Sequence, residues 1–473
     1  MTATTAAAAT FKTASQDRVR PHAVRILQVY AVAMLVIPSD IAIQAIGGAS
    51  FPAGLVGMFA FLVWVMATLF GLHDPRLHKS PIRWVLLAFW VTTLISYALI
   101  NRSALGVHEL KGADRYLMEL AMMTGIVFLA TECLTTLDDV RRVLRTVVWA
   151  GAFCGFVACL QFWLRIDITP VLRKLPGFSV VTDSAGIGGR DSVARAVGTA
   201  THPIELGIVA AILLPLAIWL ALYDNGDRSA LKRWGPVVLI ALSGVVSVSR
   251  SAILCVAIAV AVLLVAMPAR QRVVALSALP VAVAGVFVSA HGLIRALLNL
   301  LGLGAADPSI AHRVNNYTYV EEVVRHAPWF GQGVGTYIAD SNLHILDNQY
   351  LKTMIESGLL GALALFGLFF IPMIASLIAR HNSRDPALRL LCAATAAGAL
   401  AAVVGSGTFD AFSFNMFYAA VALLLGLTGA AWRLVIQEVQ TRGTAVSQPD
   451  HNYDRPPPVK LARRARSVEA QGA

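Results

Sequence analysis

The chain alternates between long apolar stretches and short polar segments. Residues 203–223 contain a single charged residue, Glu205, and residues 251–268 contain none. An apolar run of about 20 residues is the length that an α-helix needs to cross roughly 30 Å of hydrocarbon. The stretches lack the two-residue alternation that is typical of a membrane β-strand. This pattern predicts an all-α polytopic membrane protein.

Counted along the chain, the apolar stretches predict about twelve transmembrane helices, the seventh of them short. Their expected ranges are 26–46, 52–72, 84–100, 116–134, 143–164, 203–223, 235–248, 251–268, 273–291, 349–378, 387–406 and 412–432. We predict a polar N-terminal tail over residues 1–25, a transmembrane domain over 26–440 and a disordered basic tail over 441–473.

Lys and Arg residues are densest in the short segments after every second predicted helix, for example Arg141, Arg142 and Arg145. Cations that flank membrane helices mark the cytoplasmic side, so both chain ends are expected in the cytoplasm. Only 14% of the residues are charged and 57% are hydrophobic, with a formal net charge of +11. Soluble domains carry roughly 25% charged residues, which excludes a soluble globular protein. We expect membrane lipid, and not nucleic acid, around the chain.

Two predicted outer segments, 165–202 and 292–348, are much longer than ordinary connections. Loops of this length usually carry function or are disordered. The second contains aromatic residues such as Trp329 and Phe330, and its stretch 315–325 has helical character. We predict a partly helical extracytoplasmic cap.

Several ionisable residues are predicted at the outer ends of the apolar stretches. Arg250 lies between two apolar runs that are joined by almost no loop. A charged residue at this depth costs a few kcal/mol unless it is paired or faces water, so it indicates a functional site. Arg195 and Arg313 are predicted on the same side. Because guanidinium groups bind phosphate through paired hydrogen bonds, these arginines favour a site for a phosphorylated group.

Four sequence blocks, taken together in this order, resemble the O-antigen ligase and polymerase superfamily. They are Arg195-Ala-Val-Gly-Thr-Ala-Thr-His-Pro-Ile-Glu-Leu-Gly207, Ser249-Arg250-Ser251, Pro328-Trp-Phe-Gly-Gln-Gly-Val-Gly335, and Asp347-Asn-Gln-Tyr-Leu351 followed by Glu356-Ser-Gly-Leu-Leu-Gly361. The resemblance covers roughly residues 190–375. It implies a fold that resembles the GT-C-like lipid-linked glycosyltransferases.

Members of this superfamily transfer a glycan from an undecaprenyl-pyrophosphate carrier to a sugar hydroxyl at the outer face of the bacterial cytoplasmic membrane. Ligases use a glycolipid acceptor, and polymerases use a second lipid-linked repeat unit. The resemblance implies that Arg195, Arg250 and Arg313 hold the pyrophosphate of the donor. Polysaccharide assembly proteins are candidate partners. The outer segments contain no Asp-x-Asp pair, so we predict a metal-independent, inverting glycosyltransferase without a cofactor.

The resemblance leaves more than one candidate for the general base. Family ligases typically carry a His directly before the Asn of the fourth block, where this chain has Asp347. His344 and Glu205 are the other candidates for the base. Asn348, Tyr350 and His202 are expected to contact substrate. In the alternative interpretations, Asp347 and Asn348 cap a helix and Glu205 is a buried ion-pair partner.

A transporter is the main alternative to an enzyme. A multi-pass secondary transporter or a flippase for lipid-linked oligosaccharides would also have many spans and internal chain ends. Such proteins usually contain two related halves with broken helices at the midplane, and the sequence shows no convincing repeat. A purely structural membrane protein would leave the outer arginines unexplained.

Overall fold

The structure is a computed structural model that describes residues 21–72, 80–101, 105–181, 188–190, 193–224, 226, 229–277, 308–338 and 345–447. It is mostly helical, and in these residues eight helices are long and apolar enough to cross a membrane. They are α2 (Pro52–Leu69), α3 (Pro81–Ala98), α4 (Val107–Cys133), α5 (Leu137–Cys159) with its π-helical extension η3 (Leu160–Leu164), α7 (Pro203–Tyr223), α13 (Gln349–Asn382), α14 (Pro386–Ser406) and α15 (Asn415–Ser447). The all-α polytopic fold is confirmed.

The predicted number of about twelve helices is not reached within the described residues. Two further helices are apolar but shorter, α8 (Ala230–Val246) and α9 (Arg250–Ala266). Residues 21–35 and 269–277 are also helical. The ninth predicted span, 273–291, lies mostly outside the described residues.

The first predicted span, 26–46, is wrong in its second half. The helix ends at residue 35, and Ile41–Ala42 form strand β1. Pro38 explains the early end, because the residue before a proline is disfavoured in the α conformation and proline lacks an N–H donor. Strand β1 pairs antiparallel with β2 (Ser179–Val180), which belongs to the long predicted outer segment.

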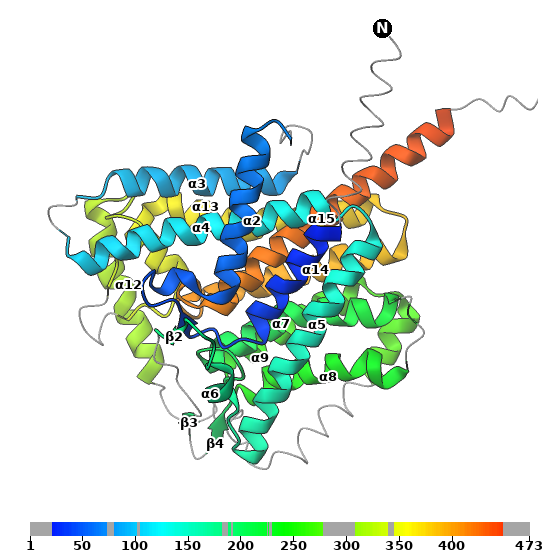
Figure 1. Cartoon of the computed structure of the whole chain (residues 1–473), viewed down its shortest axis with the longest axis horizontal. Coiled ribbons are helices and arrows are strands. Elements are labelled where there is room, and N and C mark those ends of the chain that lie inside the picture. Colours follow the sequence, from blue (N-terminus) through cyan, green and yellow to red (C-terminus); the bar gives the residue numbers. More distant parts are fainter. Residues whose placement is uncertain are drawn as a thin grey trace, which may run out of the picture.

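The two long outer segments contain short elements of their own. The first carries α6 (Thr169–Leu172), β2, and the hairpin of β3 (Gly188–Arg190) and β4 (Val193–Arg195). The second carries α12 (Pro308–His326), which includes the helix predicted over 315–325. Figure 1 shows α12 and these strands at the left and lower left, whereas the C-terminal part of α15 extends to the upper right.

Helices α7, α14 and α15 form the centre of the bundle. In the most apolar stretch of α7 and of α15, 83% of the residues are buried, against 28% in α2. Helix α14 packs against α7, α9, α13 and α15, and α4 packs against both α2 and α15. Helices α2 and α3 therefore lie at the periphery, where their exposed apolar side chains face the lipid.

Helix α13 is broken near its start, at Gly358, whose backbone has φ 66°. The loop after α12 fills the break: Gln332 N and Gly333 N donate to the carbonyls of Ile355 and Glu356, and Leu359 N donates to Pro328 O. Non-helical backbone is tolerated at membrane depth only where other protein groups satisfy it. The loop therefore anchors α12 and the segment that follows it to the transmembrane bundle.

Helices α7 and α9 approach closely where Gly207 faces the first turn of α9. A Cβ atom at this position would overlap the Cβ of Ala252 and lie 2.7 Å from Ser247 Oγ. The glycine therefore lets the start of α9 pack directly on the start of α7.

We expect Gly207→Ala to destabilise the protein by about 1–3 kcal/mol, because the two helices would have to separate to accept a rigid methyl group. Thermal unfolding of the detergent-purified protein measures this effect. Gly367→Ala is the matched control, since the nearest atom to its new Cβ, Ile371 Cδ1, lies 3.7 Å away. Equal melting temperatures for the two variants would contradict the packing argument.

Candidate functional site

The N-termini of α7, α9, α13 and α15 lie at one face of the bundle. Gly207 joins the starts of α7 and α9. The short segment 409–415, just before α15, contacts α7 and α13: the rings of Phe414 and His202 lie 6.0 Å apart, and Gln349 N donates to Phe409 O. The first N–H groups of a helix have no partner within the helix, and each helix N-terminus carries partial positive charge. This face therefore favours a negatively charged ligand.

Glu205 holds two of these helix starts together. Its side chain is fully buried and accepts four hydrogen bonds. Oε2 accepts from the amide and the hydroxyl of Thr201, each at 2.8 Å. Oε1 accepts from Met416 N at 2.8 Å and Phe417 N at 3.2 Å, in the first turn of α15. Because both oxygens are occupied by protein donors, Glu205 is suited to anchor the helices.

Arg195 and Arg250, far apart in the sequence, come from segments that contact each other. Ala196 N donates to Val246 O at 3.2 Å, and Arg195 Nε donates to Ser247 O at 3.4 Å. Arg250 is the first residue of α9, directly after the N-cap Ser249. Both arginine side chains are half-buried. Two guanidinium groups therefore lie near the start of one helix.

The turn that leads into Arg250 has an unusual backbone. Val248 has φ 47°, in the left-handed region that a β-branched residue rarely adopts. Its side chain is buried, so packing holds the conformation in place. Strained backbone of this kind often occurs at functional sites. Here the left-handed residue reverses the chain between α8 and α9 without a loop.

A buried glutamine fixes the other side of the arginine segment. Gln161, in the π-helical turn η3, accepts from Val197 N at 3.1 Å and Gly198 N at 2.7 Å. Its Nε2 donates to Gly198 O at 3.2 Å and to Asp167 Oδ1 at 3.0 Å. Partial burial opposes ionisation of Asp167, but hydrogen bonds from Thr169 and Gln161 outweigh it and lower the pKa of this carboxyl. Val197 and Gly198, two and three residues after Arg195, are therefore fixed to the end of α5.

The fourth predicted block lies at the start of α13. Asn348 is the N-cap, and its Oδ1 accepts from Tyr350 N at 2.9 Å and Leu351 N at 3.3 Å. Tyr350 donates its hydroxyl to Val403 O at 2.9 Å and therefore joins α13 to α14. Asp347, one residue before the cap, is exposed. Asn348 therefore serves as a helix cap and Tyr350 as a packing contact between two helices. The exposed Asp347 side chain is accessible to a substrate.

Two predicted site residues cannot be placed. His344 and the side chain of Arg313 lie outside the described residues. Their predicted roles stay predictions.

His202 is the N-cap of α7, and its Nδ1 accepts from Ile204 N at 3.2 Å. Burial lowers the pKa of His202 to about 4, and the Arg195 cation adds to this effect. The imidazole is therefore neutral at pH 7 and keeps Nδ1 free of a proton for the capping bond. Its position beside Arg195 and Phe414 places a hydrogen-bonding group at the face of helix N-termini.

A group of charged residues that are not among the predicted site residues lies beside this face. Lys352 Nζ donates to Asp410 Oδ2 at 2.8 Å and to Ser413 Oγ at 3.0 Å. Arg115 pairs with Glu119 at 2.6 Å and also donates to Asn415 Oδ1 at 3.3 Å. The signal for these residues was present, because ionisable residues at the ends of apolar stretches indicate a site. Sequence distance hid the contacts of Lys352 with Asp410 and of Arg115 with Asn415.

The arrangement offers cations and helix N-termini for a phosphate group and an exposed carboxylate as a proton acceptor. In the part of the chain that the structure describes, no group of three or more His, Cys, Asp or Glu side chains is placed to hold a metal ion. Metal independence nevertheless stays a prediction.

Residues 235–366 match the family model described as O-Antigen ligase. The match includes Arg250, Arg313 and Asp347, and it supports the resemblance to the O-antigen ligase and polymerase superfamily. No curated protein matches the chain significantly. The apolar helices indicate a multi-pass membrane protein, and residues 235–366 are similar to O-antigen ligases. This similarity suggests a glycosyltransferase-type activity on lipid-linked glycans in polysaccharide assembly.

We expect the His202 ring to make stability depend on pH. Unfolded His has a pKa near 6.5, so between about pH 6.5 and pH 4 the unfolded chain binds a proton that the fold excludes. The neutral His202 ring therefore contributes to the free energy of unfolding above pH 6.5, and this contribution is lost as the pH falls to about 4. For a half-buried ring we expect a loss of about 2 kcal/mol.

Unfolding of wild type and His202→Asn, measured from pH 8 to pH 4, tests this expectation. Asn is also a good N-cap, so the variant keeps the capping bond and removes the titrating group. Its stability should fall less steeply than that of wild type. Parallel curves for the two proteins would show that His202 does not titrate as stated.

Proposed function

Because residues 235–366 carry an O-antigen ligase domain, we propose that this protein transfers or polymerises a glycan from an undecaprenyl-pyrophosphate carrier. The acceptor is a sugar hydroxyl at the outer face of the bacterial cytoplasmic membrane. The product serves assembly of a cell-surface polysaccharide. The observation that carries the proposal is the convergence of Arg195 and Arg250 at the N-terminus of α9.

Both arginines have the chemistry that a pyrophosphate leaving group needs. As the bond between the anomeric carbon and the phosphate oxygen breaks, negative charge grows on the pyrophosphate. Guanidinium groups and helix N–H groups that are already in place stabilise this charge without reorganising. The pyrophosphate of the donor therefore binds between Arg195 and the first turn of α9. The lipid tail of the donor lies along the apolar helices.

The acceptor hydroxyl attacks the anomeric carbon from the side opposite the leaving pyrophosphate, so the configuration inverts. The hydroxyl proton passes to a base, and the bond to the phosphate oxygen breaks as the new glycosidic bond forms. Asp347 is our first choice for the base, because its carboxylate is exposed beside the helix N-termini. Glu205 ranks below it, because protein donors already occupy both of its oxygens.

Asn348 and Tyr350 support the site mainly by fixing the start of α13. His202 is placed to offer a neutral hydrogen-bonding group to the substrate. Arg313 and His344 remain candidates for the pyrophosphate site and for the base.

We expect Arg250→Ala to lower glycan transfer by about 100-fold or more, as is typical when one donor to a developing negative charge is removed. The assay uses the full chain in nanodiscs with an undecaprenyl-pyrophosphate oligosaccharide as donor, and it follows release of undecaprenyl pyrophosphate and growth of the glycan. EDTA should leave the wild-type rate unchanged.

Arg272→Ala is the matched control. This arginine donates to the carbonyls of Val265 and Met267 at the opposite end of α9, so its loss should leave transfer intact. Transfer at the wild-type rate in Arg250→Ala would refute the assigned role. Movement of the donor between leaflets without any glycan transfer would favour the flippase alternative.

We expect Asp347→Asn to lower kcat by about 100-fold or more while donor binding stays unchanged, because the variant has no group to accept the proton. Asn supports a helix start as well as Asp does, so a purely structural Asp347 would tolerate this change. Asp347→Glu should keep part of the activity. A fully active Asp347→Asn protein would move the role of base to another residue.

A further inference from the structure

A second basic cluster lies at the end of the bundle opposite Arg250. Arg145 pairs with Asp224, with Nη2 at 2.5 Å and Nε at 3.1 Å from Oδ1. Asp224 follows the last residue of α7, whose first turn carries Glu205. A helix of this length spans roughly 30 Å. The cluster therefore lies about one hydrocarbon thickness away from the proposed pyrophosphate site.

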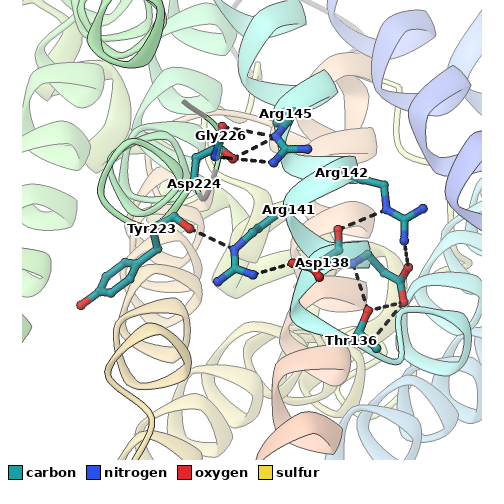
Figure 2. Close-up of polar contacts among 9 residues, drawn as sticks. Thr136, Asp138, Arg141, Arg142, Arg145, Tyr223, Asp224 and Gly226 are labelled. Carbon is teal, nitrogen blue, oxygen red and sulfur yellow. Dashed lines mark hydrogen bonds and ion pairs between the residues drawn. The ribbon is translucent and has the colours of Figure 1, made fainter. Parts of the chain in front are cut away.

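Other arginines surround this ion pair, as Figure 2 shows. Arg141 pairs with Asp138 at 2.6 Å, and Arg142 pairs with Asp139 at 2.9 Å and is 51% exposed. Gln28 donates to Arg142 O at 3.3 Å and so joins helix 21–35 to α5, with exposed Arg25 one turn away. The basic cluster thus contains four arginines and three aspartates, which leaves one excess positive charge. Its residues are Arg25, Arg141, Arg142, Arg145, Asp138, Asp139 and Asp224.

An apolar groove of about 430 Å³ begins at Arg145. It lies between helix 21–35 and α5, and its lining residues are Val32, Val36, Arg145, Thr146, Trp149, Ala150 and Phe153. Arg145 is its single charged lining residue. From Arg145 to Phe153, α5 rises roughly 12 Å toward the middle of the bundle. The groove therefore has a cationic mouth and a hydrocarbon-lined floor.

The flank that carries the groove faces lipid. Trp149 is 49% exposed and Val32 is 41% exposed, although both belong to apolar membrane helices. Exposed apolar surface within a membrane is covered by acyl chains. Arg145 uses Nε and Nη2 for Asp224, which leaves its Nη1 available to donate to a lipid headgroup.

We propose that this groove binds one anionic glycerophospholipid, with its phosphate at Arg145 and Arg142 and one acyl chain between Trp149 and Val32. Basic clusters at the ends of membrane helices recognise anionic headgroups in this way. The excess positive charge selects an anionic lipid over a zwitterionic one. The donor carrier is not the occupant, because its pyrophosphate binds at the opposite end of the bundle. The lipid holds helix 21–35 against α5.

Bromine on an acyl chain quenches tryptophan fluorescence at contact, so Trp149 reports on the groove directly. The full chain is placed in phosphatidylcholine nanodiscs that contain the same fraction of brominated phosphatidylglycerol or brominated phosphatidylcholine. The signal of Trp149 is the difference between wild type and Trp149→Phe. We expect apparent binding of phosphatidylglycerol to exceed that of phosphatidylcholine about fivefold, as one arginine contact provides.

The double variant Arg145→Gln/Asp224→Asn should lose this preference. It removes both members of the ion pair and so leaves no buried charge unpaired. Arg233→Gln is the matched control, because Arg233 lies at the same end of the bundle and bonds to Ala221 O, away from the groove. This control should keep the preference.

Equal quenching by the two lipids, or an unchanged preference in the double variant, would overturn the proposal. Relief of quenching by undecaprenyl phosphate at a lower mole fraction than phosphatidylglycerol would assign the groove to the carrier instead. Lipid preference and glycan transfer are separate measurements, so this test does not depend on the proposed enzyme activity.

Discussion

A buried carboxylate that satisfies the starts of two helices is the interaction on which the outer face depends. The first N–H groups of a helix have no partner within the helix, and leaving them unsatisfied inside a membrane protein is costly. Glu205 accepts from the first turn of α15 and from the segment just before α7. A carboxylate without these donors would be equally costly at this depth. The N–H groups therefore need the carboxylate as an acceptor, and the carboxylate needs the N–H groups as donors.

The position of the arginines follows from this contact. With the start of α7 fixed, Gly207 admits the first turn of α9, and Arg250 is carried to the same face. Gln161 fixes Val197 and Gly198, just after Arg195, from the opposite direction. Segment 409–415 then connects the start of α7 to the start of α13, beside which Asp347 lies. Cations, helix dipoles and an accessible carboxylate are thereby gathered at one end of an apolar bundle, as transfer from a charged lipid carrier requires.

The two ends of the bundle use arginine differently. At one end, the guanidinium groups of Arg195 and Arg250 adjoin the start of a helix, a place that attracts anions. At the opposite end, Arg141, Arg142 and Arg145 are each paired with an aspartate, and an apolar groove starts beside the last of them. Pairing lowers the free energy of keeping these charges next to hydrocarbon while leaving spare donors for a headgroup. In our two proposals, one residue type thus serves a reaction at one end of the bundle and lipid binding at the other.

The sequence by itself determined the membrane fold and the helix over 315–325, because apolar length and helical pattern are local properties. It also indicated Arg195, Arg250 and Glu205, since a charge within an apolar stretch is conspicuous. Only the tertiary structure decided that Glu205 is enclosed by backbone donors, that Asn348 is a cap, and that Lys352 pairs with Asp410. The end of the first helix at residue 35 and its pairing through β1 also required the folded chain. Partners separated by many residues meet only through packing, and no local pattern encodes which donor reaches which acceptor.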